Sequence, residues 1–178
     1  MKILDKVNIL LDYGEVEIEK IKEFERKLRI SLPPLYVNFI TKHNGASIFE
    51  SDFDYSDPNR DGRKNGDSLA FLRSEEIESD MKSLLKQTTE DENDPNLFKF
   101  YHYFDKWLIP FGENGGGDFI CFDYRNDKTT DNPPIVIWNH DMGLKHRVIF
   151  IANNFEEFVG MLYESEEAKE DRKNWKGW

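Results

Sequence analysis

Two short apolar runs separated by a glycine-rich segment limit what this chain can fold into more than any other feature. Residues 107–111 and 119–123 are mostly apolar, and residues 112–118 between them hold four glycines. Glycine adopts the positive φ angles that tight turns need, and apolar runs this short are typical of strands. Residues 135–138 and 148–151 are similar runs. The sequence therefore predicts an antiparallel sheet in the second half of the chain.

In the first half of the chain, the apolar residues are spaced as in helices. Between residues 15 and 28, apolar residues recur every three or four positions, which places them on one helix face. These residues are Ile18, Ile21, Phe24 and Leu28. Two prolines at 33–34 are expected to open a second helix, which continues to residue 40 and stops at the Asn-Gly pair of residues 44–45. Similar spacing predicts a third helix over residues 75–87.

A closing helix is expected after Asn154. The Asn154 side chain can accept hydrogen bonds from free N–H groups, and Glu157 can reach back, as in a capping box. Helices first, then a run of strands, then one more helix is an α+β order. The predicted fold is therefore a single antiparallel sheet packed against N-terminal and C-terminal helices, in one domain spanning residues 1–178.

The remaining segments are polar or ambiguous. Residues 51–67 are rich in Asp, Asn and Gly and are predicted to form a loop, followed by a short strand over residues 68–72. Residues 90–95 are expected to be an acidic loop, and residues 98–103 fit either a strand or a helix. The tail from residue 164 to 178 is charged but contains Trp175 and Trp178, so we expect it to dock on the domain or on a partner.

Composition excludes several classes of function. The 178 residues carry a net charge of −11, with a sequence pI of about 4.9, so the surface should repel a nucleic-acid backbone. A single cysteine allows no intramolecular disulfide and no cysteine-based zinc site. The longest apolar run, residues 148–152, is far shorter than the ~20 residues of a membrane span. The N-terminus has no uninterrupted apolar stretch, which favours a cytoplasmic protein.

Six segments, taken in order, resemble one family. They are residues 32–40, 44–45, 108–112, 116–123, 136–141 and 151–158. The ordered set is similar to the SUKH superfamily, which includes fungal cell-wall-assembly regulators and many bacterial immunity proteins, over a core of about residues 14–163. The resemblance implies an α+β fold and, for bacterial members, a cytosolic protein that binds and neutralises a toxin. It implies no catalytic residues. The residues that match fold-shaping positions are Pro33, Asn44, Gly45, Gly117, Asp123, Trp138 and Phe155.

Four patterns suggest chemistry, but each has a simpler interpretation. Residues 57–62 copy the first half of a calcium loop, yet Ser68 stands where the bidentate Glu belongs. The glycines at 115–117 precede an acidic residue and a strand rather than the helix of a phosphate loop. Cys121 is expected to be a buried small apolar residue. His140-Asp141 lacks partners at metal-ligand spacing. We therefore expect no catalytic residues, cofactor or metal.

The acidic clusters are the stronger indication of function. Carboxylates at 52–67 and 90–94 could complement the basic cleft of a nuclease or deaminase toxin, with interleaved aromatics as anchors. Solvated surface charge is the alternative explanation. The residues predicted to bind a partner are Asp52, Phe53, Asp54, Tyr55, Asp57, Asp61, Asp67, Glu90, Asp91, Glu92 and Asp94. The leading hypothesis is an immunity protein that binds a protein toxin and acts on no nucleic acid or membrane. The alternative is a non-catalytic regulatory or scaffold module in stress or cell-wall signalling.

Overall fold

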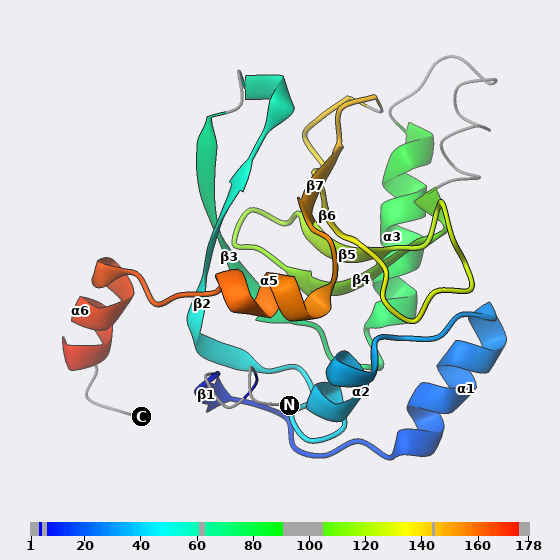
Figure 1. The fold of residues 1–178 in the computed structure, drawn as a ribbon, viewed down its shortest axis with the longest axis horizontal. Helices are drawn as coiled ribbons and strands as arrows, with labels where there is room; N and C mark the ends of the chain where they lie inside the picture. The colour runs from blue at the N-terminus through cyan, green and yellow to red at the C-terminus, as the bar shows by residue number, and fades with distance from the viewer. Residues whose placement is uncertain (1–3, 5–6, 61–62, 91–104, 144, 175–178) are drawn as a thin grey trace.

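A computed structural model describes residues 4, 7–60, 63–90, 105–143 and 145–174. Its centre is a seven-stranded antiparallel sheet in which each strand pairs with the next one along the chain (Figure 1). The strands are β1 (Ile9–Leu11), β2 (Ser47–Ser56), β3 (Lys64–Phe71), β4 (Leu108–Glu113), β5 (Phe119–Asp123), β6 (Ile135–Trp138) and β7 (Val148–Ala152). The predicted α+β fold with one antiparallel sheet is confirmed.

Helices precede, interrupt and follow the sheet. They are α1 (Ile18–Leu28), α2 (Pro34–Ile40), the 3-10 turn η2 (Pro58–Arg60), α3 (Ile77–Glu90), α5 (Phe155–Met161) and α6 (Glu166–Asn174). Helix α1 ends at Arg29, whose φ of 57° is left-handed. The predicted cap of α5 is confirmed, because the Glu157 N–H donates to Asn154 Oδ1 over 2.9 Å. The Glu157 carboxylate reaches one residue further back than predicted, to the N–H of Asn153.

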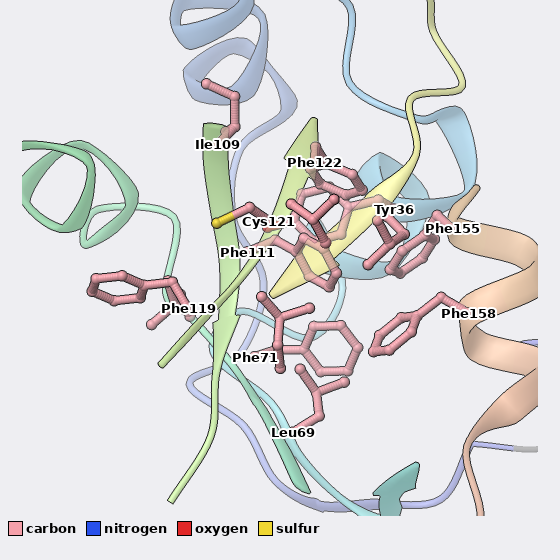
Figure 2. Close-up of a cluster of buried hydrophobic side chains, with 14 of the residues drawn as sticks. Tyr36, Leu69, Phe71, Ile109, Phe111, Phe119, Cys121, Phe122, Phe155 and Phe158 are labelled. Carbon is pink, nitrogen blue, oxygen red and sulfur yellow. The ribbon is translucent and has the colours of Figure 1, made fainter. Parts of the chain in front are cut away.

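The core is a cluster of aromatic rings between α2, α5 and the middle strands (Figure 2). Tyr36 from α2 meets Phe122 of β5 and Phe155 of α5 edge-on, with ring centroids 5.0 and 5.5 Å apart. Figure 2 shows Phe119 and Cys121 pointing away from α5, and they too are buried. All five residues of β5 and all four of β6 are buried, so both faces of these strands are covered.

The prediction of a loop over residues 51–67 is wrong. The segment forms most of a long hairpin, with β2 and β3 in register from Asp52↔Ser68 to Ser56↔Lys64 and a 3-10 turn near the tip. Although the segment is polar overall, burial alternates along its strands: Phe53 and Leu69 point inward, while Asp54 is exposed. A hairpin with one solvated face looks like a loop when judged by composition. The predicted strand at 68–72 is the last part of β3.

Gly112 allows two strands to approach closely. A Cβ at this position would lie 2.3 Å from Leu69 Cδ1 and 3.1 Å from the Ala70 carbonyl oxygen. Because Leu69 is buried in the core, Gly112→Ala should lower the free energy of unfolding by about 1–3 kcal/mol through overpacking. Urea denaturation would measure the change. Gly115→Ala is the matched control, since nothing lies within 4 Å of its Cβ position; equal effects of the two substitutions would contradict the packing argument.

Candidate functional site

The outer edge of β2 is shared between two distant segments of the chain. Strand β1 pairs with the start of β2 at Ile9↔Ile48, and further along Tyr163 forms an isolated antiparallel bridge with Asp52. The Asp52 N–H donates to the Tyr163 carbonyl over 3.0 Å, and the Tyr163 N–H donates back over 2.9 Å. The chain that leaves α5 therefore runs along the hairpin before α6 begins, and α6 stands beside β2 in Figure 1.

Three side chains at this edge form what we call the hairpin face: Asp52, Asp54 and Tyr163. The Tyr163 hydroxyl donates to Asp54 Oδ1 over 3.0 Å, and the Ser165 N–H donates to Asp52 Oδ2 over 3.0 Å. Tyr163 is 41% exposed and Asp54 is exposed. The hydrogen bond to Asp54 is the main cause that raises the pKa of Tyr163, and the charges of Asp54 and Asp52 add to it. The phenol therefore stays neutral at physiological pH, as a hydrogen-bond donor beside two carboxylates.

Helix α6 is held against β2 through its polar side chains. Ser165 caps the helix, with its hydroxyl accepting from the Ala168 N–H over 3.2 Å. The Arg172 guanidinium lies 4.8 Å from the centroid of the Phe49 ring and also pairs with Glu164 over 3.0 Å. The described part of the tail thus contacts the domain at β2. Trp175 and Trp178, on which the docking prediction depended, lie outside the described residues.

The aromatic residues predicted to anchor a partner are not exposed anchors. Phe53 is 0% exposed, and its ring lies 5.2 Å from that of Phe158 in α5. Tyr55 is partly buried and packs against the same core. The expectation of exposed anchors is therefore wrong, because strand alternation turns both side chains inward, away from Asp54. The exposed aromatic residue of this surface is Tyr163.

Two of the predicted acidic residues have structural partners instead of open surface. Asp57 is only 3% exposed, and its Oδ1 accepts from the Asn59 N–H over 2.8 Å, which stabilises the hairpin turn. Asp67 accepts from Asn114 Nδ2 over 2.7 Å and from the Ser68 N–H. Burial, opposed by these bonds and aided by the charge of Asp118, raises the pKa of Asp67. Neither residue joins the hairpin face.

The other predicted residues lie largely outside the described part. Asp61, Asp91, Glu92 and Asp94 are not described, and Glu90 is the last residue of α3, with no description of its side chain. The role of this second acidic cluster stays a prediction. Near the hairpin tip, Arg63 and Lys64 are exposed. The negative charge of the described hairpin is therefore greatest along the middle of β2, at Asp52 and Asp54.

His140 belongs to a structural network away from the hairpin face, whereas Asp141 contacts its Nε2 atom from an exposed position. The buried Asp118 carboxylate accepts from the His140 N–H over 3.0 Å and from His140 Nδ1 over 2.8 Å. Its other oxygen accepts from Asn139 Nδ2 and Asn114 Nδ2, over 3.0 and 3.1 Å. One carboxylate thus joins the β4–β5 turn to the loop after β6. The backbone N–H and Nδ1 of His140 are both used in this link.

Cys121 is in the wrong environment for a nucleophile. It is fully buried, and burial raises the pKa of its thiol well above the ordinary value, with the charges of Asp123 and Asp105 acting in the same direction. Within the described ranges, no three His, Cys, Asp or Glu side chains gather in a way that could hold a metal ion. The described helices include none that is both long and apolar enough to cross a membrane.

Comparison with known proteins decides the family. Residues 15–161 match the model of the SMI1 / KNR4 family (SUKH-1). The chain belongs to this family. Two relatives come from Bacillus subtilis (strain 168), and both are 29% identical to this chain. SPbeta prophage-derived uncharacterized protein YokK aligns over 86% of this chain and 79% of its own length. Uncharacterized protein YobM aligns over 85% of this chain and 67% of its own length.

Several residues that link the chain to the SMI1/KNR4 family have clear structural roles. Gly45 and Gly117 adopt positive φ angles of 62° and 90°. Trp138 is fully buried under the guanidinium of Arg147, 5.1 Å from the ring centroid. The Asp123 carboxylate accepts from Nε and Nη2 of Arg125, at 2.8 Å each. These residues therefore hold the fold.

Sequence reasoning missed Tyr163. Its pairing with Asp52 spans 111 positions, so no local spacing could indicate it. Tyr163 also follows the end of the family match at residue 161. The one available signal was an aromatic residue placed between the closing helix and the charged tail.

Proposed function

We propose that this protein is an immunity protein that binds a bacterial toxin, of nuclease or deaminase type, in a stoichiometric protein–protein complex. The observation that carries the proposal is the match to the SMI1 / KNR4 family (SUKH-1) over residues 15–161. The hairpin face supplies a surface suited to a basic partner, with exposed carboxylate and aromatic groups side by side. Such a protein would act in the cytoplasm, where a nuclease toxin meets its substrate.

The proposed mode of action is occlusion without turnover. Asp52 and Asp54 would attract the basic cleft of the toxin and raise the association rate. Tyr163 would fill a pocket beside that cleft, while its hydroxyl remains oriented by Asp54. The bridge between Asp52 and Tyr163 fixes both residues on adjacent backbone segments, so little conformational freedom would be lost on binding.

The test is capture of the partner from the native cells, followed by co-expression with the captured protein. A captured toxin domain, whose lethality is relieved by this chain, is the expected result. Capture of a signalling or cell-wall assembly complex would instead favour the regulatory or scaffold alternative. Recovery of no toxin, together with no relief of toxicity by co-expression with neighbouring gene products, would reject the immunity proposal.

Tyr163→Ala should weaken binding of the captured partner. Removal of an exposed aromatic anchor at an interface costs about 2 kcal/mol, which corresponds to a roughly 30-fold higher Kd. Titration calorimetry would measure it on the purified complex. Phe150→Ala is the control, because Phe150 is also an exposed aromatic residue (54%) but lies on β7, at the other end of the sheet. A larger loss for Phe150→Ala would move the binding surface to that strand.

A further inference from the structure

A groove separate from the hairpin face lies between α1 and the start of α3. Its volume is about 570 Å³, enough for one or two side chains of a partner. Ile21 and Phe24 from α1, Leu32 and Ile77 supply apolar lining. Tyr36 of α2 lines the same groove and is almost fully buried. The groove thus combines an apolar wall with polar groups, which come from Asn44 and Ser74 as well as from charged residues.

The charges around the groove are predominantly negative. Its lining includes four glutamates and two lysines, and one lysine, Lys27, is already paired with Glu78 over 2.5 Å. Glu75 accepts hydrogen bonds from Asn44 Nδ2 over 3.2 Å and from the Ser74 hydroxyl over 3.0 Å. Hydrogen bonds to its carboxylate lower the pKa of Glu75, so this group stays ionised. Glu15 and Glu23 add further negative charge. The excess of negative charge around the groove therefore favours a positively charged ligand.

The Tyr36 hydroxyl is a second, independent indication of a ligand. It is buried, and it has no hydrogen-bond partner in the described part of the chain. Burial raises the pKa of Tyr36, so the hydroxyl is a neutral group that can both donate and accept. A buried hydroxyl without a partner is unfavourable and rare in folded proteins. Tyr36 is one of the residues that line the groove, so a group bound there is the candidate partner for this hydroxyl.

We infer that this groove receives an arginine side chain, flanked by an apolar residue, from a partner protein. The aliphatic stem of arginine suits the Ile21 and Phe24 surface, and its guanidinium suits Glu75 and the other carboxylates. The five N–H donors of the guanidinium also give the Tyr36 hydroxyl a donor to accept from. This site goes beyond the proposed function, since it shares no residue with the hairpin face and holds whether or not the partner is a toxin.

The test uses two blocked tripeptides, acetyl-Leu-Arg-Leu-amide and acetyl-Leu-citrulline-Leu-amide, titrated into the full-length protein. Citrulline has the shape of arginine without its charge. Methyl NMR signals of Ile21 and Ile77 should shift saturably with the arginine peptide. The citrulline peptide should bind about tenfold more weakly, because charge-assisted hydrogen bonds are lost. Absence of saturable shifts at these methyl groups, or equal affinity for the two peptides, would overturn the inference.

Two variants test the two polar contacts one at a time, and a third tests whether this site is independent of the hairpin face. Glu75→Gln should weaken the arginine peptide at least about threefold. Tyr36→Phe should weaken it by a similar factor while raising the melting temperature of the free protein, since an unpaired buried hydroxyl is removed. Asp54→Asn should leave peptide binding unchanged even where it impairs partner capture. A lower melting temperature with unchanged peptide affinity for Tyr36→Phe would show that the hydroxyl is already satisfied and would refute its assigned role.

Discussion

Phe111→Ala is expected to lower the free energy of unfolding by about 3–5 kcal/mol, the range for a fully buried aromatic residue. Phe111 is 0% exposed and stacks on Phe122 with ring centroids 4.3 Å apart. It also meets Phe155 and Phe158 of α5 edge-on, at 5.6 and 5.8 Å. The substitution would leave a cavity where β4 meets α5, and the surrounding rings could collapse into it only in part.

Chemical denaturation would measure this loss against Phe150→Ala, the same substitution at an exposed strand position. The control should change the free energy of unfolding by no more than about 0.5 kcal/mol. Because small domains are stable by only about 5–15 kcal/mol, the Phe111 variant would lose a large part of its stability. A loss below about 1.5 kcal/mol would mean that the aromatic cluster is looser than its ring distances indicate.

The strands around Phe111 were predictable because their sequence signal is local. Strands β4 and β5 are short apolar runs on either side of a glycine turn, and their observed bounds of 108–113 and 119–123 agree with the predicted ones to within two residues. The closing helix was equally predictable, since Asn154 caps it through the backbone of a residue three positions away. A strand buried on both faces is a run of apolar residues, and a helix cap lies within one turn of its partner. Both signals can be recognised from the spacing of residues in the sequence.

The candidate site was harder to predict because its geometry is non-local. Half of the hairpin is solvated, so the polar residues around Phe53 suggested a loop, although the alternation of Phe53 and Tyr55 was present in the sequence. Composition outweighed periodicity in that prediction. The exposed aromatic of the hairpin face, Tyr163, reaches Asp54 from 109 positions away. Only the tertiary structure brings these two residues together.

Net charge alone is likewise a poor guide to the binding surface. Of the acidic residues described in the hairpin, Asp57 and Asp67 bond to neighbouring groups of the fold, whereas Asp54 is exposed beside Tyr163. A carboxylate whose oxygens accept hydrogen bonds from the fold is less available to a partner, and this holds in part for Asp52, which accepts from the Ser165 N–H. The same distinction separates Asp118 from Asp141, two acidic residues that both contact His140.

Asp118→Asn should therefore be strongly destabilising, by about 3 kcal/mol, because buried donors lose their acceptor. One oxygen of Asp118 accepts from two nitrogens of His140, and the other accepts from the amides of Asn139 and Asn114. The NH₂ group of the substituted side chain would replace one of these oxygens, so at least two donors would face another donor. Asn114 has no compensating flip available, since its own Oδ1 already accepts from the N–H groups of Gly116 and Asp118, at 2.9 and 2.8 Å. The link between the β4–β5 turn and the loop after β6 would be broken.

Asp141→Asn is the matched control, because Asp141 contacts the other nitrogen of His140, Nε2, over 3.1 Å but is 84% exposed. Its substitution should change the free energy of unfolding by no more than about 0.5 kcal/mol, as is usual for an exposed side chain. Hydrogen exchange gives a local readout: the His140 amide, which donates to Asp118, should exchange faster in Asp118→Asn and at the native rate in Asp141→Asn. Equal stability of the two variants, with equal protection of the His140 amide, would contradict this prediction. It would mean that the hydrogen bonds of the buried carboxylate do not hold the two loops together.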